Sequence, residues 1–488
     1  MAATTSTPSQ AVRWRAPLFL NGQWVEGIES FPVHDKFTGE EIGVASRATR
    51  EQVDGAVGSA RASFERERLD GQRRYQILHD TAGLIASRRK DFIDRIVAEA
   101  GFPVADADTE VSRTIQTFLI SAEEAKRLSG EMVPIENAPG NAHRLAFTIR
   151  VPRGVVCGIT SFNSPLNMVA HKLAPAIASG NTVVVKPPQT TPFSAALLFE
   201  LLLAAGLPPG HAALLQGPGA EIGRWLIENQ DVRFFSFTGS TAVGRLLQQS
   251  VGLRPVSLEL GSISGTIVCD DADLERAAPR CVASAFRRAG QVCTSTQRLY
   301  VQDAVVERFT ALLVDATRQI KTGNPREAAT VVGPMISEAD AQRAEVWVAE
   351  AVRDGAMLLH GGRRSGSLFE PTILLGSQRD MKVMCEEIFA PVLSIVPFQS
   401  LDEAIREVNS VPFGLAAGVF TKDIDRAMFA ARRLHVGIVH INESSSSRVD
   451  LIPFAGVKDS GLGREGPKYA MQEMTEERLI TLSLETPR

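Results

Sequence analysis

Apolar positions recur at helical spacing in the first third of the chain. Between Gly71 and Ala100, apolar side chains return every three or four residues, which predicts one long amphipathic helix. Gly101 and Pro103 follow directly, and both residue types terminate helices. A second helix is predicted over about residues 108–128, with its apolar side chains on one face.

After Pro152 the pattern changes to short apolar runs that alternate with helical stretches rich in alanine and leucine. The runs are Val155–Ile159, Thr182–Val185, Ala213–Leu215, Phe234–Phe237 and Val256–Leu260. Alternating strands and helices predict a doubly wound parallel sheet with helices on both faces. Such sheets bind ligands beyond the carboxyl ends of their strands.

A second α/β region is predicted from about Gly261 to His440. Its strand-like runs are Arg298–Val301, Val392–Pro397 and Ala417–Phe420, and the chain ends near a further β-prone run, Ile480–Leu484. With 488 residues, the chain is too long for one compact core, which agrees with two or three domains.

Composition excludes several classes of partner. The net charge of −4 provides no broad basic field, which argues against nucleic acid. The longest apolar run, Ala195–Leu203, is too short to span a bilayer and contains Glu200. Residues 1–16 are rich in serine and threonine and lack acids, and we interpret them as a disordered tail in preference to a transit peptide. The cytoplasm is the expected compartment, with no membrane association.

Five cysteines without CxxC or CxxH spacing argue against a disulfide framework and against a metal site. Cys157 and Cys269 lie in apolar runs, where cysteine is usually a small hydrophobic residue. Cys293 differs, because small and hydroxyl-bearing residues surround it in the segment Gly290–Ser295. Such a setting suits a reactive thiol, although composition alone leaves a structural cysteine equally open.

Glu259 ends the apolar run Val256–Leu260, so its carboxylate is expected to be poorly solvated and its pKa raised toward that of a useful base. The alternative is a glutamate at a strand end that faces solvent.

The glycine-containing turn Thr238–Gly244 follows a strand and opens a helix, where backbone N–H groups bind pyrophosphate, unless it is only a tight connection. Lys186 ends another strand and could reach a phosphate or a ribose, or could be a solvated surface lysine.

Seven segments, in the same order, resemble the aldehyde dehydrogenase family, and the resemblance extends over nearly the whole chain. The segments are Gly154–Pro165, Gly180–Pro187, Phe237–Ser240, Leu258–Gly261, Gly290–Cys293, Glu386–Pro391 and Gly456–Gly461. This resemblance implies that Cys293 attacks an aldehyde, that Asn163 donates its side-chain amide to the oxyanion, and that Glu259 activates the hydrolytic water.

The resemblance also implies a nicotinamide cofactor, NAD or NADP. Lys186, Gly239 and Ser240 would hold its adenosine ribose and pyrophosphate, while Glu387 and Phe389 would place the nicotinamide ribose and ring.

The chain departs from the family pattern at four positions. Phe162 stands before Asn163 where tryptophan is common, and Gln189 stands where members that prefer NAD often have glutamate. Ser262 and Ala455 each occupy a position where glycine is usual.

The implied fold is α/β, with a Rossmann-like cofactor domain, an α/β catalytic domain and a small β oligomerisation element. Residues 17–130 and 151–258 would bind the cofactor, and residues 259–441 would carry the catalytic cysteine. Residues 131–150 and 470–488 would join copies of the chain into homodimers or homotetramers.

Four positions of the implied substrate tunnel carry cationic or titratable side chains. They are Arg113, His171, Arg287 and Arg448. Several such groups around one tunnel would be costly to bury without an anion. With a further resemblance to the phosphonoacetaldehyde and lactaldehyde dehydrogenase branch, they favour a small anionic aldehyde, with phosphonoacetaldehyde or a related phosphono- or phospho-aldehyde as the best guess.

Alternatives remain. Lactaldehyde, glycolaldehyde and succinate semialdehyde are rival substrates, and an inactive structural relative is a rival class of protein. The presence of Glu259 disfavours a CoA-acylating enzyme. The arginines could instead pair with nearby acids, and Asp450 is the obvious partner for Arg448.

Overall fold

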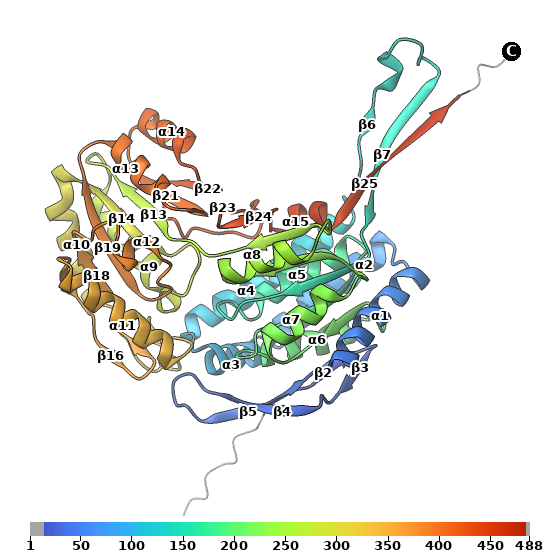
Figure 1. The fold of residues 1–488 in the computed structure, drawn as a ribbon, viewed down its shortest axis with the longest axis horizontal. Helices are drawn as coiled ribbons and strands as arrows, with labels where there is room; N and C mark the ends of the chain where they lie inside the picture. Colours follow the sequence, from blue (N-terminus) through green and yellow to red (C-terminus); the bar gives the residue numbers. More distant parts are fainter. Residues whose placement is uncertain (1–13, 485–488) are drawn as a thin grey trace, which may run out of the picture.

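The computed structural model describes residues 14–484, and three structural parts are visible in it (Figure 1). One part is built on an eight-stranded sheet, a second on a seven-stranded sheet, and the third is a narrow ribbon that projects from the body. The predicted α/β fold is confirmed. No helix within residues 14–484 is both long and apolar enough to cross a membrane.

The eight-stranded sheet has five parallel strands at its centre, as the alternating pattern predicts. In spatial order these are β12 (Val256–Glu259), β11 (Val232–Thr238), β8 (Val155–Ile159), β9 (Thr182–Lys186) and β10 (Ala212–Leu214). Antiparallel strands complete the two edges: β24 (Gly461–Leu462) beside β12, and β2 (Leu18–Leu20) and β3 (Gln23–Val25) beyond β10.

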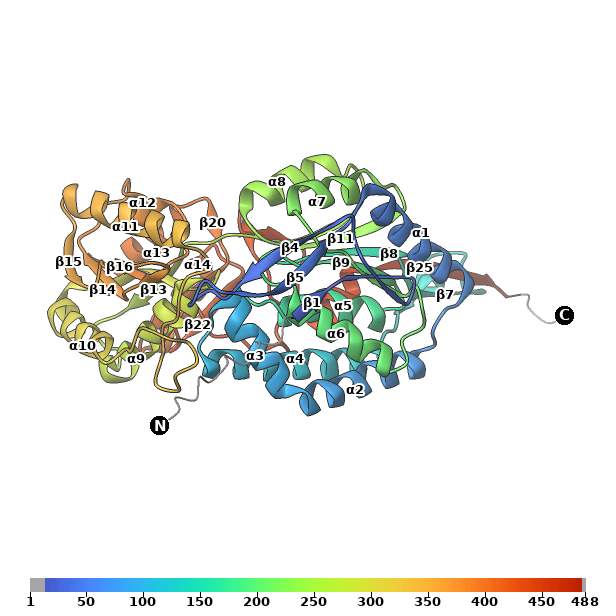
Figure 2. The same cartoon turned by 90° about the horizontal axis from the view of Figure 1, so that it is seen from below.

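Helices cover both faces of this sheet because successive side chains of each strand point to opposite sides. Figure 2 shows α1, α7 and α8 on one face and α2 to α6 on the other. Cys157 is buried against the first group, in agreement with its expected role as a small hydrophobic residue. The helix bounds are α1 (Arg50–Arg66), α2 (Gly71–Ser87), α3 (Arg89–Ala100), α4 (Val104–Ala125), α5 (Asn167–Ala178), α6 (Phe193–Ala204), α7 (Gly219–Glu228) and α8 (Thr241–Ser250).

The prediction of a single helix over residues 71–100 is wrong in one respect. Arg88 has φ −104° and ψ 19°, which is not helical, so the segment divides into α2 and α3. The apolar spacing continues across this break, and periodicity alone therefore does not reveal it. The predicted end is correct, because Gly101 adopts the left-handed conformation (φ 75°) that closes α3.

The N-terminal region contains a small sheet that the hydrophobic pattern did not predict. Its strands are β1 (Trp14–Ala16), β5 (Glu41–Arg47) and β4 (Glu29–His34), in that spatial order. The tail predicted to be disordered comprises residues 1–16, and residues 1–13 of it lie outside the described residues. Its last three residues form β1, so the tail prediction extended three residues too far.

The seven-stranded sheet is parallel except for one edge strand. Its order is β15 (Met357–His360), β18 (Thr372–Leu375), β19 (Val392–Phe398), β14 (Thr296–Gln302), β13 (Ser264–Val268), β21 (Ala416–Phe420) and β22 (Ile438–Ile441), and β15 is antiparallel. Its helices are α9 (Leu274–Phe286), α10 (Val306–Arg318), α11 (Glu338–Arg353), α13 (Leu401–Asn409) and α14 (Ile424–Arg433). The three strands predicted for this region are confirmed.

The ribbon consists of β7 (Arg144–Pro152) and β25 (Thr475–Ser483), with β6 (Met132–Val133) beside β7. β7 and β25 pair antiparallel along their whole length, and the three strands project from the body (Figure 1). Leu479 and Leu482 on β25 are 56% and 41% exposed, which is unusual for leucine in a strand.

Short elements connect these parts. They are β16 (Arg364–Ser365), β17 (Leu368–Phe369), α12 (Lys382–Cys385), β20 (Phe413–Gly414), β23 (Val457–Lys458) and α15 (Pro467–Glu473), with 3-10 turns at Ile135–Asn137, Arg287–Gly290 and Asp303–Val305.

Candidate active site

The register of the parallel strands brings the predicted polar residues to one edge of the eight-stranded sheet. Ile159 on β8 lies opposite Lys186 on β9, and Thr238 on β11 lies opposite Glu259 on β12. The carboxyl ends of these strands therefore meet, and the loop after β8 carries Asn163 to the same edge. The sequence predicted a ligand site here, and the geometry agrees.

Cys293 follows a strained turn that is fastened to its surroundings. Arg288 and Ala289 in this turn have φ values of 52° and 54°, which non-glycine residues rarely adopt. The guanidinium of Arg288 donates to the carbonyl oxygen of Asn163 (2.8 Å) and pairs with Glu110 (3.2 Å). These contacts hold the turn, and with it the position of Cys293 relative to Asn163.

The thiol of Cys293 is half-buried, and its electrostatic surroundings are mixed. Burial raises its pKa to about 12, the charge of Arg448 opposes that rise, and Glu259, Glu387 and Glu465 add to it. The resting side chain is therefore a thiol, and anything that places positive charge near it favours the reactive thiolate.

The side-chain amide of Asn163 is oriented by two hydrogen bonds. Its Oδ1 accepts from the hydroxyl of Ser161 (2.7 Å), and its Nδ2 donates to the carbonyl oxygen of Gln291 (2.9 Å). An amide nitrogen carries two hydrogens, so one N–H of Asn163 remains for a ligand.

Glu259 is buried, and within residues 14–484 neither of its carboxylate oxygens has a hydrogen-bond partner. Burial raises its pKa well above the usual range, and the negative charge of Glu465 adds to this effect. Lys172 and Arg448 oppose the rise without cancelling it. Glu259 is thus a poorly solvated carboxyl group, as its place at the end of an apolar strand indicated.

Glu465 is a central residue that sequence reasoning missed. It is buried between Lys172, whose Nζ lies 2.7 Å from Oε1, and Arg448, whose Nη2 lies 2.6 Å from Oε2. Burial alone would raise the pKa of Glu465, but the charges of Lys172, His171 and Arg448 lower it below its usual range. Lys172 reaches this position by crossing Gly158 of β8, where an added Cβ would lie 2.8 Å from the Cβ of Lys172.

The predicted adenosine-binding residues lie around the end of β9 and the start of α8. Burial lowers the pKa of Lys186 to about 8, and within residues 14–484 its ammonium group has no hydrogen bond or ion pair. The hydroxyl of Ser240 caps α8 by accepting from the amide of Val243 (3.5 Å), and Gly239 precedes it. Gln189 is exposed beyond the end of β9. A buried lysine without a partner beside a helix N-terminus fits a pyrophosphate-bearing ligand.

The predicted nicotinamide-binding residues meet on the other side of Cys293. Glu387 accepts from the backbone amide of Ser262 (2.9 Å), and burial raises the pKa of Glu387 to about 7. An added Cβ on Gly261 would lie 2.7 Å from Oε2 of Glu387, so this glycine leaves the space that the carboxyl group needs. Phe389 has φ 50° and meets Phe162 edge to face, with 5.9 Å between ring centroids.

The four predicted substrate residues divide into paired and unpaired groups. Asp450 accepts from Arg113 through two contacts (2.6 and 3.1 Å) and lies 2.9 Å from Nε2 of His171. The sequence suggested Arg448 as its partner, and the two form a long ion pair (4.0 Å from Nε), while Arg448 pairs more closely with Glu465.

Arg287 has no carboxylate partner within residues 14–484. Its Nη2 donates to the hydroxyl of Ser446 (3.2 Å), and its Nε is buried without a hydrogen-bond partner. Burial lowers its pKa to about 10. Ser446 also contacts the hydroxyl of Thr294 (3.0 Å), which places Arg287 one side chain away from the residue after Cys293.

The family model described as "Aldehyde dehydrogenase family" matches residues 24–480. The chain belongs to the aldehyde dehydrogenase family. As predicted, it is an oxidoreductase that oxidises an aldehyde with NAD or NADP.

Three comparisons place this aldehyde dehydrogenase more closely. It is 47% identical over 467 residues to 3-sulfolactaldehyde dehydrogenase of Priestia megaterium, covering 96% of this chain and 98% of the relative. It is 35% identical to aldehyde dehydrogenase 21 of Physcomitrella patens, solved with the reaction product succinate (TM-score 0.94; 97% and 99% of the two chains). It is also 35% identical to the NADP-dependent glyceraldehyde-3-phosphate dehydrogenase of Bacillus halodurans, solved with NADP (TM-score 0.94; 97% and 100%).

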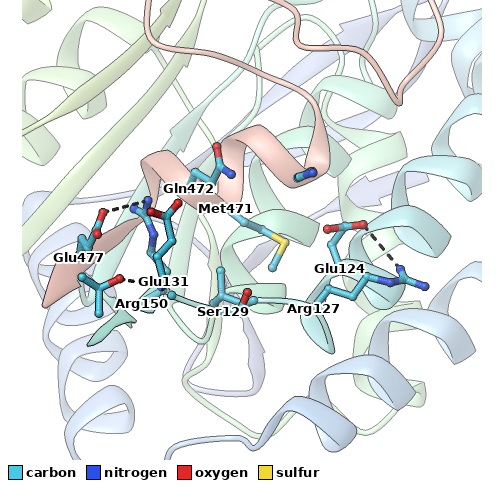
Figure 3. A pocket seen from close by; sticks show the side chains of 12 residues that line it. Glu124, Arg127, Ser129, Glu131, Arg150, Met471, Gln472 and Glu477 are labelled. Carbon is cyan, nitrogen blue, oxygen red and sulfur yellow. Dashed lines mark hydrogen bonds and ion pairs between the residues drawn. The ribbon is translucent and has the colours of Figure 1, made fainter. Parts of the chain in front are cut away.

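One pocket of this aldehyde dehydrogenase lies away from the catalytic groups. It encloses about 320 Å³ where the ribbon meets the body (Figure 3). Arg127 and Arg150 on its wall already face Glu124 (3.6 Å) and Glu477 (3.4 Å). None of the predicted site residues lines this pocket, so it is separate from the candidate active site.

We expect Asp450→Asn to lower the free energy of unfolding by about 3 kcal/mol, because it leaves Arg113 and His171 without their shared counter-charge. The pKa of Asp450 is lowered well below its usual value, since His171 and Arg113 outweigh the effect of burial. The difference between the two proteins should therefore be full above the ordinary aspartate pKa of 3.8 and should shrink as the pH falls below it. Urea denaturation followed by circular dichroism measures both.

The matched control is Asp91→Asn, which breaks an exposed pair with Arg88. It should cost less than about 1 kcal/mol. An Asp450→Asn loss no greater than that of the control would contradict a stabilising role for this network.

Proposed function

We propose that this aldehyde dehydrogenase oxidises a small aldehyde that carries an anionic group, through a thioester on Cys293. The observation that carries this proposal is Arg287, a largely buried guanidinium without a carboxylate partner in the described chain, on the turn that leads to Cys293. A guanidinium in such a place favours an anionic ligand, because an isolated buried charge is costly.

The substrates named for the related enzymes agree with an anionic class. Sulfolactaldehyde carries a sulfonate, succinate a carboxylate, and glyceraldehyde 3-phosphate a phosphate. Phosphonoacetaldehyde remains the substrate favoured by the tunnel arginines, and sulfolactaldehyde joins it as a first compound to test. Lactaldehyde and glycolaldehyde, which are neutral, are the alternatives.

The four predicted substrate residues would share this task unequally. Arg287 is free to form new ionic contacts, whereas Asp450 already engages Arg113 and His171. Direct binding of the substrate by Arg113, His171 and Arg448 stays a prediction.

We propose that the first chemical step is attack by Sγ of Cys293 on the carbonyl carbon. The new S–C bond moves the carbonyl π electrons onto oxygen, where the free N–H of Asn163 donates a hydrogen bond to the oxyanion. Oxidised NAD or NADP, which Lys186, Ser240 and Glu387 would hold, would supply the acceptor for the hydride that leaves this carbon as the C=O bond reforms. A thioester on Cys293 results.

Glu259 would then act as the general base of thioester hydrolysis. Its raised pKa makes the carboxylate basic enough to take a proton from water while water oxygen attacks the thioester carbon. Collapse of that tetrahedral species releases the carboxylate product and returns Cys293 as a thiol or thiolate.

Domain roles follow from the same proposal. Residues 17–130 and 151–258 would bind the cofactor, and residues 259–441 would carry Cys293. The ribbon of β6, β7 and β25 would join subunits into dimers or tetramers, since its leucines are exposed on a projecting sheet.

Substitution separates the nucleophile from the base. Cys293→Ala should abolish hydride transfer, because no covalent adduct forms. Glu259→Gln should retain a rapid burst of reduced cofactor but lose turnover, because the thioester is not hydrolysed. Stopped-flow absorbance of reduced cofactor measures both phases, and normal steady-state turnover in Glu259→Gln would refute its role as base.

Arg287 should determine the preference for anionic aldehydes. Arg287→Gln is expected to lower kcat/KM for the preferred anionic substrate by roughly 30- to 1000-fold, the usual effect of losing one charged contact. Rates with propanal should stay within about threefold, since propanal makes no such contact. Arg280→Gln, on α9, breaks an ion pair with Glu443; it is the control and should leave both rates unchanged. Equal losses on charged and neutral aldehydes would contradict the anionic proposal.

Gln189 should permit NADP. A glutamate at this position would bind the ribose 2′-hydroxyl and repel a 2′-phosphate, whereas glutamine does not repel it and Lys186 lies at the end of the same strand. We expect kcat/KM for NADP within about tenfold of that for NAD, a difference of about 1.4 kcal/mol. Gln189→Glu should weaken NADP selectively. Rejection of NADP by several orders of magnitude in the unmodified enzyme would disprove this reading.

A further inference from the structure

Arg448 and Cys293 both lie against one small apolar cluster, formed by Leu415, Ala416 and Phe454. The guanidinium carbon of Arg448 lies 3.8 Å from the ring centroid of Phe454. Cys293 packs against the cluster that Phe454 forms with Leu415 and Ala416. One buried cluster is therefore in contact with both the cation and the thiol.

Arg448 is held in this position without help from a substrate. Its Nη2 is bound to Glu465, which Lys172 holds from the other side, and Nη2 lies 3.4 Å from Nε2 of His171. Its Nε is buried and has no hydrogen-bond partner within residues 14–484, since the nearest carboxylate oxygen, on Asp450, is 4.0 Å away. The side chain thus retains a buried N–H donor, at Nε, that no described protein group uses.

We propose that Arg448 is the cation that stabilises the thiolate of Cys293, and that it is not primarily a ligand for the anionic group of the substrate. This inference rests on the proposed role of Cys293 as nucleophile. It assigns the two central arginines of the tunnel to different tasks: Arg287 binds the substrate, and Arg448 supports the nucleophile.

The charges that face Cys293 explain why such a cation is needed. Glu259, Glu387 and Glu465 all disfavour the thiolate, and burial disfavours it further. Arg448 is the strongest favourable charge acting on Cys293. Arg287 also faces the thiol, but its neighbours Arg288 and Arg113, together with Asp106, influence it more strongly than Cys293 does. Removal of Arg448 would leave the thiolate among three carboxyl groups.

Alkylation of the free thiol by iodoacetamide tests this inference independently of the aldehyde. The thiolate forms the new S–C bond as iodide leaves, so the rate at a given pH follows the thiolate fraction. We would measure the rate at Cys293 by peptide mass spectrometry from about pH 6.5 to about pH 9.5, without cofactor. Cys385 is the internal reference, because it is half-buried and its pKa responds to burial, Glu386 and Asp380 and not to Arg448.

Arg448→Gln should slow alkylation of Cys293 about tenfold at each pH, which corresponds to a pKa rise of about one unit. Arg448→Lys keeps the charge and should restore the rate to within about threefold of the unmodified enzyme. Alkylation of Cys385 should be the same in all three proteins. If iodoacetamide alkylates Cys293 as fast in Arg448→Gln as in the unmodified enzyme, the inference is overturned.

Arg287→Gln is the matched comparison. It should leave alkylation of Cys293 within about threefold while lowering turnover of the anionic aldehyde, whereas Arg448→Gln should lower turnover of anionic and neutral aldehydes alike. A selective loss on the anionic aldehyde in Arg448→Gln, with normal alkylation, would return Arg448 to substrate binding and leave the proposed function intact. Labelling of the buried Cys157, Cys269 or Cys281 in Arg448→Gln would report that this variant unfolds. In that case Arg448→Lys decides. A tenfold lower alkylation rate at Cys293 in Arg448→Lys, measured relative to Cys385, would overturn the inference.

Discussion

Charges buried beneath the carboxyl edge of the eight-stranded sheet must be paired, and this requirement organises the active site. Glu465 accepts two cations, one from α5 and one from the loop before Phe454, and Asp450 accepts a third from α4 together with His171. The contacts made by Lys172, Arg113 and His171 link helices of the first half of the chain to the C-terminal region, whereas the pair of Arg448 and Glu465 lies within that region. The network that neutralises the charges is therefore also what holds the loop of residues 443–453 over Cys293.

The same requirement produces two kinds of carboxyl group within one site. Glu465 and Asp450 have cations in direct contact, and their pKa values are lowered. Glu259 and Glu387 are buried without such contacts, and their pKa values are raised. Acids that stabilise the fold are thus kept ionised, whereas the two that face Cys293 and the cofactor region hold a proton more readily than ordinary carboxyl groups.

The sequence predicted those features that have a local signal. The five central strands were predicted because each is a short apolar run between helical stretches, and the strand ends then located Glu259, Lys186 and the turn at Ser240. The break at Arg88 was missed because the apolar spacing continues through it. Glu465 and Lys172 were missed because their pairing joins residues 293 positions apart, and one sequence carries no sign of such contacts. The sequence suggested Asp450 as an ion-pair partner for Arg448 and did not suggest Arg113. The bidentate contact of Asp450 with Arg113 depends on how α4 lies against the loop.

The long separation of these pairs has a consequence for how the chain folds during synthesis. Arg113 and Asp450 are 337 positions apart, and β25 pairs with β7 across a similar distance. Contacts of such high sequence separation form late, because the loop between them must close first. Until the segment that carries Asp450 and Glu465 has docked, Arg113 on α4 and Lys172 on α5 lack these acids. Docking of this segment therefore neutralises both cations and completes the catalytic site in one event.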